Sequence, residues 1–306
     1  MMQVKKIAGF ALVLMMAITA RAQELIALNL ARNGTYTHSS ASKVSIRQTV
    51  SGQQTDVSMN VSSTINFTVT GIRDTLYLME ARYTRLAVDM KLPDGNVSYS
   101  SDKDNDPMSN LLAMIINKPF DIRMTKKGRI TASSGVESLI AGIADSLAGV
   151  SDAQKQQLRD QVTKAYGDQA LKGSIEMVTA LFPDTRVAPG NKWSVRSRLE
   201  SGLPAAVETI YELKAVTDSS YRIAGSSLIR TENKDEYMPL DKMFVKYDLT
   251  GTMLTDIEID KKTGWIISCA GKQQIAGTAE MKTDAGPSAT GMIITMIIKN
   301  ELTTTR

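Results

Sequence analysis

Apolar and polar residues alternate along most of the first hundred residues, which is the pattern of half-buried β-strands. Within residues 59–70 the apolar positions share one parity: Met59, Val61, Ile65, Phe67 and Val69. Odd positions are apolar over Tyr77–Tyr83, whereas even positions are apolar over Leu86–Leu92. This change of parity within one run predicts a β-bulge near Thr84–Arg85. The sequence LPDGN then predicts a tight turn, with Gly95 at positive φ.

The middle of the chain changes to a helical period, over about residues 135–181. The apolar positions that carry this period are Val136, Leu139, Ile140, Ile143, Ala144 and Leu147. Ser151, with Gln154 three residues later, predicts a capping box for a following helix. Upstream, Asp106 followed by Pro107 is typical of the N-cap and first position of a short helix.

Strand-like segments return from about residue 183 to the end of the chain. The last of them is apolar on both parities from Met292 to Ile298, which predicts a strand buried on both faces. Strands, then helices, then strands predict an α+β fold. We expect a large curved antiparallel sheet, shaped like an incomplete barrel, with the central helical block packed on or in it. Residues 23–306 would form one β-rich domain, with strand regions 23–133 and 183–306 joined by the helices at about 135–181.

One phrase occurs twice, as DIRMTKKGRIT from Asp121 and DIEIDKKTGWI from Asp256. Each copy has an alternating apolar strand, two lysines, a glycine and a further apolar residue. Glycine after charged residues is common in hairpin turns, so the repeat predicts two turns rather than a recognition motif. The repeat also fits an internal duplication, although ten residues are too few to establish one.

The first 22 residues have the organisation of a secretory signal peptide. Lys5 and Lys6 precede an apolar run that is too short to span a bilayer, and Ala20-Arg21-Ala22 fits a cleavage site before Gln23. No cysteine follows the cut, so we expect no lipoprotein anchor, no transmembrane segment in the mature chain, and a periplasmic or secreted location. Cleavage lowers the formal charge from +4 to +1, which removes any electrostatic argument for binding nucleic acid.

Few residues offer catalytic or metal-binding chemistry. The only histidine is His38, which we expect to be exposed, and the only cysteine is Cys269, so no His/Cys zinc site and no internal disulfide can form. Asp102, Asp104 and Asp106 resemble the start of a calcium loop. However, this loop lacks the required glycine and the final acid, so a polar loop that leads into a helix fits better.

Known catalytic motifs are incomplete or missing. Ser40-x-x-Lys43 and Lys262-Thr263-Gly264 match fragments of the penicillin-binding-protein set, but the sequence has no Ser-Asp-Asn. Nor does it contain a dinucleotide fingerprint, a Walker loop, an HExxH helix or a nucleophile elbow. The sequence therefore predicts no catalytic residues, no metal site and no cofactor.

After the helical block, the sequence ALFPDTRVAPGNKWSV is similar to a family of exported proteins, typical of Bacteroidota, that carry a domain of unknown function. The matching positions are Phe182-Pro183, Val187, Pro189-Gly190-Asn191 and Trp193, together with the two repeated phrases. The resemblance covers most of the mature chain and implies no catalytic residues. More loosely, the order of elements resembles periplasmic lipoprotein-carrier folds, in which helices fill an apolar groove in a curved sheet.

Two functions remain open from the sequence. The first is an exported envelope protein, without a catalytic site, that binds a lipid or other apolar ligand between sheet and helices; its seventeen methionines suit an adaptable apolar surface. The alternative is a structural or protein-interaction module of the envelope with a solid core. An enzyme ranks third. In either case we expect Trp193, at the start of a strand, to be at least half buried against the helical block.

Overall fold

The computed structural model describes residues 23–104, 106–199, 205–240, 243–283 and 291–306. The strands are β1 (Thr35–Val50), β2 (Gln53–Arg73), β3 (Leu76–Leu92), β4 (Gly95–Ser100), β5 (Pro119–Thr125), β6 (Ile130–Ser134), β7 (Lys192–Leu199), β8 (Ala205–Val216), β9 (Ser220–Thr231), β10 (Met238–Leu240), β11 (Met243–Asp260), β12 (Ile266–Lys282) and β13 (Met292–Thr305). The helices are α1 (Pro107–Ile115), α2 (Val136–Ser146), α3 (Asp152–Tyr166) and α4 (Asp168–Thr179).

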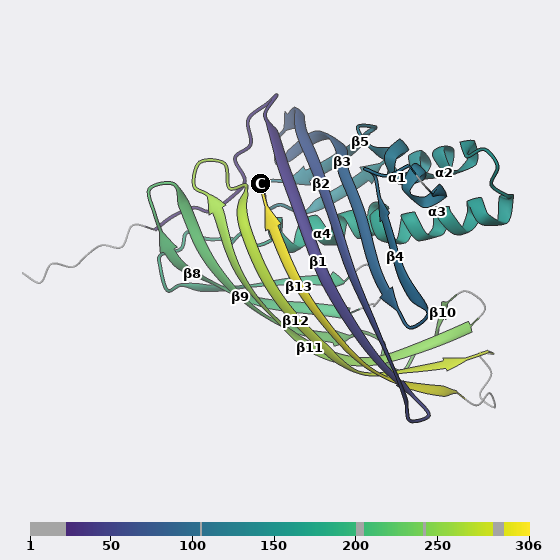
Figure 1. Cartoon of the computed structure of the whole chain (residues 1–306). Helices are drawn as coiled ribbons and strands as arrows, with labels where there is room; N and C mark the ends of the chain where they lie inside the picture. Colours follow the sequence, from purple (N-terminus) through teal and green to yellow (C-terminus); the bar gives the residue numbers. More distant parts are fainter. Residues whose placement is uncertain (1–22, 105, 200–204, 241–242, 284–290) are drawn as a thin grey trace, which may run out of the picture.

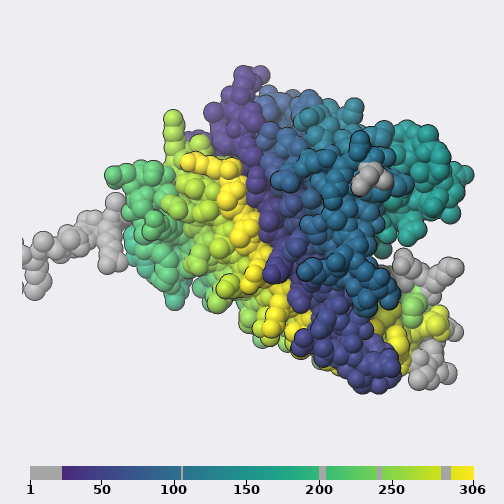
Figure 2. Space-filling model, in the orientation of Figure 1, coloured from purple at the N-terminus to yellow at the C-terminus, as the bar shows by residue number. Residues whose placement is uncertain are grey.

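The strands form one antiparallel sheet in the order β6-β5-β3-β2-β1-β13-β12-β11-β9-β8-β7, with β4 paired to β3 and β10 to β11. The first strand pairs with the last over a long register, from Ser39 opposite Thr305 to Val50 opposite Ile294. Figure 2 shows these two strands, purple and yellow, side by side across the middle of the sheet. The sheet stays open, because β6 and β7 lie at its two edges. The predicted α+β class with a large curved sheet is confirmed.

The helices lie on one side of the sheet: in the view of Figure 1, α4 passes behind β1 and β2, and α1, α2 and α3 lie to the right of β4. The main core lies between them and the strands, and it takes side chains from both strand regions and from all four helices. Its largest fully buried members include Tyr77, Tyr83, Phe67, Leu111 and Leu112. Where helices cover the concave face of the sheet, its side chains are buried in the core. Beyond the helices, this face has no covering layer.

Local sequence signals fix several element boundaries as expected. Asp106 caps α1 by accepting a hydrogen bond from the Ser109 backbone amide, at 2.8 Å, and Pro107 opens the helix. Ser151 and Gln154 form the predicted capping box of α3. The β2–β3 register shifts between Thr64 and Ile65, which leaves Thr84 as the extra residue of the predicted bulge. All three predictions are confirmed: the two caps are hydrogen bonds made within three residues, and the bulge follows from the change of parity along β3.

The prediction for β13 is wrong. Its burial alternates instead of being continuous: Ile294 and Ile298 are buried, whereas Ile293 is 61% exposed. The helices cover only one face of the sheet and do not reach the other. The apolar side chains on the uncovered face of β13 therefore have no layer to pack against, whatever their hydrophobicity.

Both copies of the repeated phrase are hairpin turns, as predicted. They join β5 to β6 and β11 to β12, and their glycines, Gly128 and Gly264, have φ of 73° and 69°. The segment that precedes β1 passes between the two turns. The Leu28 amide donates to the Lys126 carbonyl at 3.1 Å, and the Asn29 amide donates to the Thr263 carbonyl at 2.8 Å.

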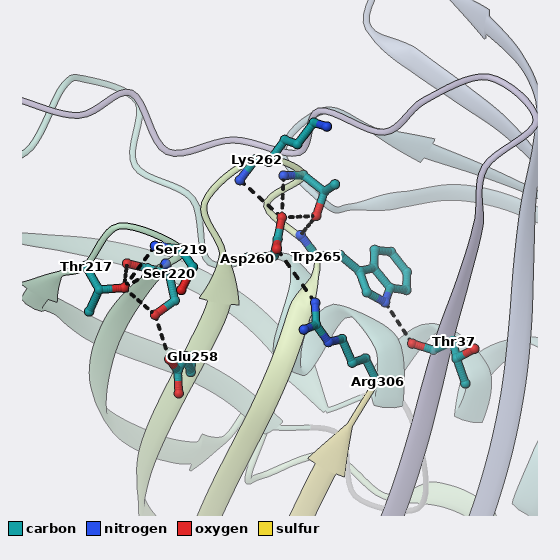
Figure 3. A network of polar contacts seen from close by, with 10 residues as sticks. Thr37, Thr217, Ser219, Ser220, Glu258, Asp260, Lys262, Trp265 and Arg306 are labelled. Carbon is teal, nitrogen blue, oxygen red and sulfur yellow. Dashed lines mark hydrogen bonds and ion pairs between the residues drawn. The ribbon is translucent and has the colours of Figure 1, made fainter.

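The second turn is held by a local polar network (Figure 3). Asp260 accepts hydrogen bonds from the Lys262 amide and from both the amide and the hydroxyl of Thr263. Arg306 forms an ion pair with the same carboxylate at 3.6 Å. The adjoining Trp265 is buried and donates its indole hydrogen to the Thr37 carbonyl at 2.8 Å. The turn is thereby tied to the start of β1 and to the end of β13.

Candidate functional site

A cavity of about 680 Å³ lies between the concave face of the sheet and the helices α3 and α4. This volume is within the range of about 300–1,000 Å³ typical of small-molecule sites. The roof is formed by one side of the helical block, with Val162 of α3 and Leu171, Gly173 and Met177 of α4. The cavity therefore lies at the end of the core, where the helices and the sheet separate.

The floor of the cavity consists of every second residue of the central strands, because side chains alternate between the two faces of a sheet. The floor is mainly apolar, with Val44, Met59, Val61, Ile275, Ile298 and Leu302 among its members. These residues come from four neighbouring strands, two near the start of the chain and two near its end. Formation of the floor thus requires the pairing of β1 with β13.

A set of uncharged polar side chains interrupts this apolar floor, and we call it the neutral strip. Its members are Ser40, Ser42, Ser63, Thr209, Gln273 and Asn300. The Ser40 and Ser63 hydroxyls lie 3.0 Å apart, and the Ser42 hydroxyl donates to Oδ1 of Asn300 at 2.7 Å. Gln273 lies opposite Asn300 in the β12–β13 register. The strip therefore crosses β2, β1, β13 and β12 side by side, with Thr209 on β8.

Charged side chains around the cavity lie at its margin or are engaged elsewhere. Lys164 is exposed on α3, and Arg198 pairs with Glu232 near the end of β7. Glu176 accepts a hydrogen bond from the Ile130 amide at 2.7 Å, which anchors α4 to the start of β6. Within the described part of the chain, the floor strands β1, β2, β12 and β13 present no charged side chain to the cavity.

Four tyrosines line the cavity, and three of them, Tyr83, Tyr166 and Tyr211, are buried. Burial raises the pKa of Tyr83 and Tyr166 well above the ordinary value, and it raises the pKa of Tyr211 to about 12. The Tyr83 hydroxyl donates to the Tyr166 carbonyl at 2.9 Å, and the Tyr166 hydroxyl donates to the Ala87 carbonyl at 3.1 Å. These hydroxyls stay neutral and join α3 to β3, so they serve packing rather than acid–base chemistry.

The expectation that His38 is exposed is wrong. His38 is 1% exposed in β1, and burial lowers its pKa to about 4. Neither ring nitrogen meets a hydrogen-bond partner among the described residues. The serine-rich sequence around His38 suggested exposure, but β1 is covered by the core at this point. A neutral imidazole without a partner is poorly suited to act as a general base.

The only cysteine is also unsuited to catalysis. Cys269 is buried on β12, and burial raises the pKa of its thiol to about 12. The thiolate needed for nucleophilic attack or metal binding is therefore disfavoured. Among the residues that the structure describes, no cluster of three or more His, Cys, Asp or Glu side chains could hold a metal ion.

The structure separates the other residues that the sequence singled out. Asp102 pairs with Arg85 at 3.1 Å, and Asp106 caps α1, so the two carboxylates serve different partners. Ser40 lines the cavity, whereas Lys43 is exposed on the opposite face of β1, because the two positions differ in parity. The proposed cleavage at Ala22–Gln23 is not tested, since Ala22 lies outside the described residues.

Trp193 is where the sequence predicts it to be. Its side chain is partly buried against the main core, and its indole donates to the Leu181 carbonyl, just after α4, at 2.7 Å. The ring also packs on Tyr211, with centroids 5.9 Å apart. The prediction of a Trp193 at least half buried against the helical block is confirmed.

The neutral strip could not be recognised in the sequence as a site. Its members are common residue types scattered from position 40 to position 300. The one available signal was parity: Ser40 and Ser42 share it with Val44, which an amphipathic strand would bury. Hydroxyls on an otherwise apolar face indicate either a polar core or a lined cavity.

No helix among the described residues is long and apolar enough to cross a membrane.

Comparison with known proteins identifies a sequence family and several similar folds. A family of unknown function, DUF6263, matches residues 74–266. This confirms the resemblance to a family with a domain of unknown function, whereas export and the Bacteroidota source stay predictions. No curated protein sequence matches the chain.

A solved structure that describes lipid–protein interactions in lipovitellin matches with a TM-score of 0.52 and 10% identity. The match covers 90% of this chain but only 25% of the lipovitellin chain, so the chain spans a quarter of that protein. At this identity the likeness shows the fold alone.

Two further structures match less well. An outer membrane channel from Pseudomonas putida F1 has a TM-score of 0.24 and 8% identity, over 90% of this chain and 97% of that chain. The β domain of a Bordetella autotransporter has a TM-score of 0.21 and 8% identity, over 88% and 98%. These scores are too low to support any argument about this chain.

Proposed function

The chain belongs to the family of unknown function DUF6263, and we propose that it is an exported cell-envelope protein that binds an apolar ligand, such as a lipid, between sheet and helices. In this proposal the protein carries or holds its ligand without changing it. Residues 1–22 are a cleaved signal peptide, and residues 23–306 act as one domain in the periplasm or outside the cell.

The observation that carries the proposal is the cavity itself. A solid core would close the space between α4 and the central strands, because protein interiors are packed as densely as organic crystals. Here about 680 Å³ remains between apolar walls. An apolar ligand would remove these walls from water and contribute about 25 cal/mol for each Å² of apolar surface buried. The fold of lipovitellin, whose structure concerns lipid–protein interactions, gives further support.

Binding without catalysis agrees with the chemistry of the residues in the core and around the cavity. His38 and Cys269, the only residues of their types, are both buried in uncharged form, as their shifted pKa values indicate. The hydroxyls nearest the cavity, Ser40, Ser42 and Thr209, have other hydroxyls or an amide as partners rather than a base. An activated nucleophile needs a neighbouring base or a lowered pKa.

Native mass spectrometry of the protein purified from its own envelope tests the proposal. We expect a co-purifying lipid whose mass remains with the folded protein and leaves on unfolding. Repeated purification without any bound ligand would contradict it. N-terminal sequencing of the same material tests export, since cleavage predicts Gln23 as the first residue, whereas a retained Met1 in envelope fractions would overturn it.

Two glycines provide a matched pair of variants for this experiment. Gly173 of α4 lines the cavity and Gly142 of α2 does not, and a Cβ at either position would meet no atom within 4 Å. Gly173→Phe should place a ring in the cavity and reduce co-purification, whereas Gly142→Phe should keep the ligand. Both replacements remove glycine from a helix, so neither should destabilise the fold. Equal ligand content in the two variants would place the ligand elsewhere.

The alternative, an interaction module of the envelope, has one observation in its favour. Three large apolar side chains are exposed on neighbouring strands of the sheet: Ile210 (52%), Leu228 (39%) and Leu254 (63%). Ile210 and Leu254 lie opposite the same residue of β9, Ser226, so the three gather in one place. Absence of ligand in native mass spectra, together with a stable protein complex in envelope extracts, would favour this function.

A further inference from the structure

We infer that the ligand carries an uncharged hydrogen-bonding group, an ester, amide or hydroxyl, and that this group lies on the neutral strip with apolar chain on both sides of it. This inference rests on the proposed function and narrows it to a class of ligand. It excludes free fatty acids and lipids whose charged headgroup would be buried in the cavity.

The hydrogen-bonding capacity of the strip is only partly used by the protein. Oδ1 of Asn300 accepts from Ser42, but the Asn300 amide nitrogen donates to no described residue. The Gln273 carboxamide lies beside Asn300 in the β12–β13 register, lines the same cavity and is only partly buried. Each carboxamide nitrogen carries two hydrogens and each Gln273 or Asn300 oxygen two lone pairs. A ligand carbonyl or hydroxyl could therefore be held at this point.

Apolar side chains lie on both sides of these two carboxamides along the same strands. On β13, Asn300 lies between Leu302 and Ile298, and all three line the cavity. On β12, the next cavity-lining residue after Gln273 is Ile275. A polar group held by Gln273 and Asn300 would thus have apolar floor ahead of and behind it. This arrangement suits a molecule in which a polar linkage joins or ends hydrocarbon chains.

The charge distribution excludes a buried anion at this position. The floor strands β1, β2, β12 and β13 present no described cation to the strip, and the nearest lining cations, Lys164 and Arg198, are exposed at the margin. A carboxylate or phosphate placed on the strip would lose its hydration without gaining a counter-charge, which is strongly unfavourable. An uncharged ester, amide or hydroxyl loses much less hydration free energy on burial, and the strip can replace its lost hydrogen bonds to water.

The experiment compares three probes on the purified, delipidated full mature protein: dioleoylglycerol, oleate at pH 8, and the hydrocarbon squalane. Binding is followed by native mass spectrometry and by displacement of a fluorescent diacylglycerol. We expect dioleoylglycerol to bind at least tenfold more tightly than oleate. Gln273→Leu with Asn300→Leu should weaken dioleoylglycerol binding roughly tenfold or more, since each lost hydrogen bond is worth about 1 kcal/mol. Squalane binding should be unchanged or stronger.

The chain offers controls of the same residue types on the opposite face of the sheet. Gln274 and Asn60 are exposed there, next to Gln273 on β12 and on β2, so Gln274→Leu with Asn60→Leu should leave the binding of all three probes unchanged. If the double strip variant fails to fold, Gln273→Leu alone gives the test, because the Gln273 side chain is only partly buried.

The outcomes separate the inference from the proposed function. If no probe binds the wild-type protein, the proposed function fails. If oleate binds as tightly as dioleoylglycerol, or if the strip variant loses all three probes equally or none of them, the cavity still binds apolar ligands but the inference is wrong.

Discussion

The two repeated turns both place a glycine at positive φ, but they differ in length and in their surroundings. In the first, the Gly128 amide donates to the Thr125 carbonyl at 2.9 Å; in the second, the Gly264 amide donates to the Asp260 carbonyl at 2.8 Å. The second turn is one residue longer, because Thr263 is inserted before the glycine. Both glycines are buried at positive φ. The repeated phrase therefore specifies a turn with a glycine at positive φ. It does not specify which segment of the protein packs on that turn.

The partner that packs on each glycine differs. Gly128 lies against the last residue of α4, and the Thr179 hydroxyl donates to the Gly128 carbonyl at 2.7 Å. Gly264 lies against Ala27 and Leu28, in the segment that precedes β1. One copy thus fixes the helical block to the sheet, and the other fixes the segment that precedes β1. Similar turn sequences serve as anchors for two unrelated segments.

Replacement of the turn glycines should have the largest effect. Gly128→Val and Gly264→Val should each lower the free energy of unfolding by about 4 kcal/mol or more, because a Cβ would overlap the carbonyl of Thr179 or Ala27 in addition to the strain of positive φ. Gly52→Val is the matched control, since Gly52 has φ of 82° but open space around it. It should cost only about 1–2 kcal/mol. Thermal and urea unfolding measure all three, and equal losses would show that packing on the turns is unimportant.

An indole anchors the surroundings of each turn, and the two should differ in strength. Trp265, next to Gly264, is 3% exposed and contacts the rings of Tyr36 and Phe67. Trp193, which bonds to the chain just beyond α4, is only partly buried. Trp265→Ala should cost about 4–5 kcal/mol and Trp193→Ala about 2–3 kcal/mol. Urea unfolding gives both values. A Trp193→Ala protein that melts like wild type would reassign Trp193 to binding.

Low pH should weaken the region of the second turn through His38, which follows the Thr37 that accepts the Trp265 indole hydrogen. The His38 pKa is lowered from 6.5 to about 4, so between these values the unfolded state binds a proton that the folded state does not. The contribution of His38 to the free energy of unfolding is therefore fully present above pH 6.5. This contribution falls by about 3 kcal/mol as the pH drops to 4.

The difference in unfolding free energy between wild type and His38→Leu isolates this contribution, because the carboxylates titrate in both proteins. That difference should shift by about 3 kcal/mol in favour of the variant between pH 7 and pH 4. A difference that stays constant over this range would mean that His38 is not buried in neutral form.

The lysines of the turns should have the smallest effect, and the structure divides them into two exposed lysines and two that form ion pairs. Lys126 and Lys262 are exposed, and their replacement by Gln should change stability by less than about 0.5 kcal/mol. Lys127 pairs with Asp184 at 3.2 Å, and Lys261 pairs with Glu24 at 3.3 Å.

Lys127→Gln and Lys261→Gln should each cost up to about 1 kcal/mol, because both pairs remain partly solvated. Melts of the four single variants at low and high salt measure these values, since salt screens the two ion pairs. If the variant with all four replacements folds normally but loses a partner or its membrane association, the repeated phrase is a recognition site.

Much of the fold could be predicted because the sequence carries local instructions. Parity over residues 59–92 gave β2, β3 and the bulge at Thr84, and capping residues gave the starts of α1 and α3. Each of these features depends on hydrogen bonds or side-chain directions within a few residues of the signal. The order of strands and helices was enough to predict an open curved sheet covered by a helical block.

The tertiary structure alone decided which of those patterns would be buried. His38 is in the core and Ile293 is exposed, against expectation in both cases, because burial depends on where the helices end and not on the residues themselves. The cavity and its neutral strip exist only because β1 pairs with β13, which brings Ser42 and Asn300 into contact across 258 positions. Periodicity specifies which face of a strand is apolar, but it does not specify what packs on that face.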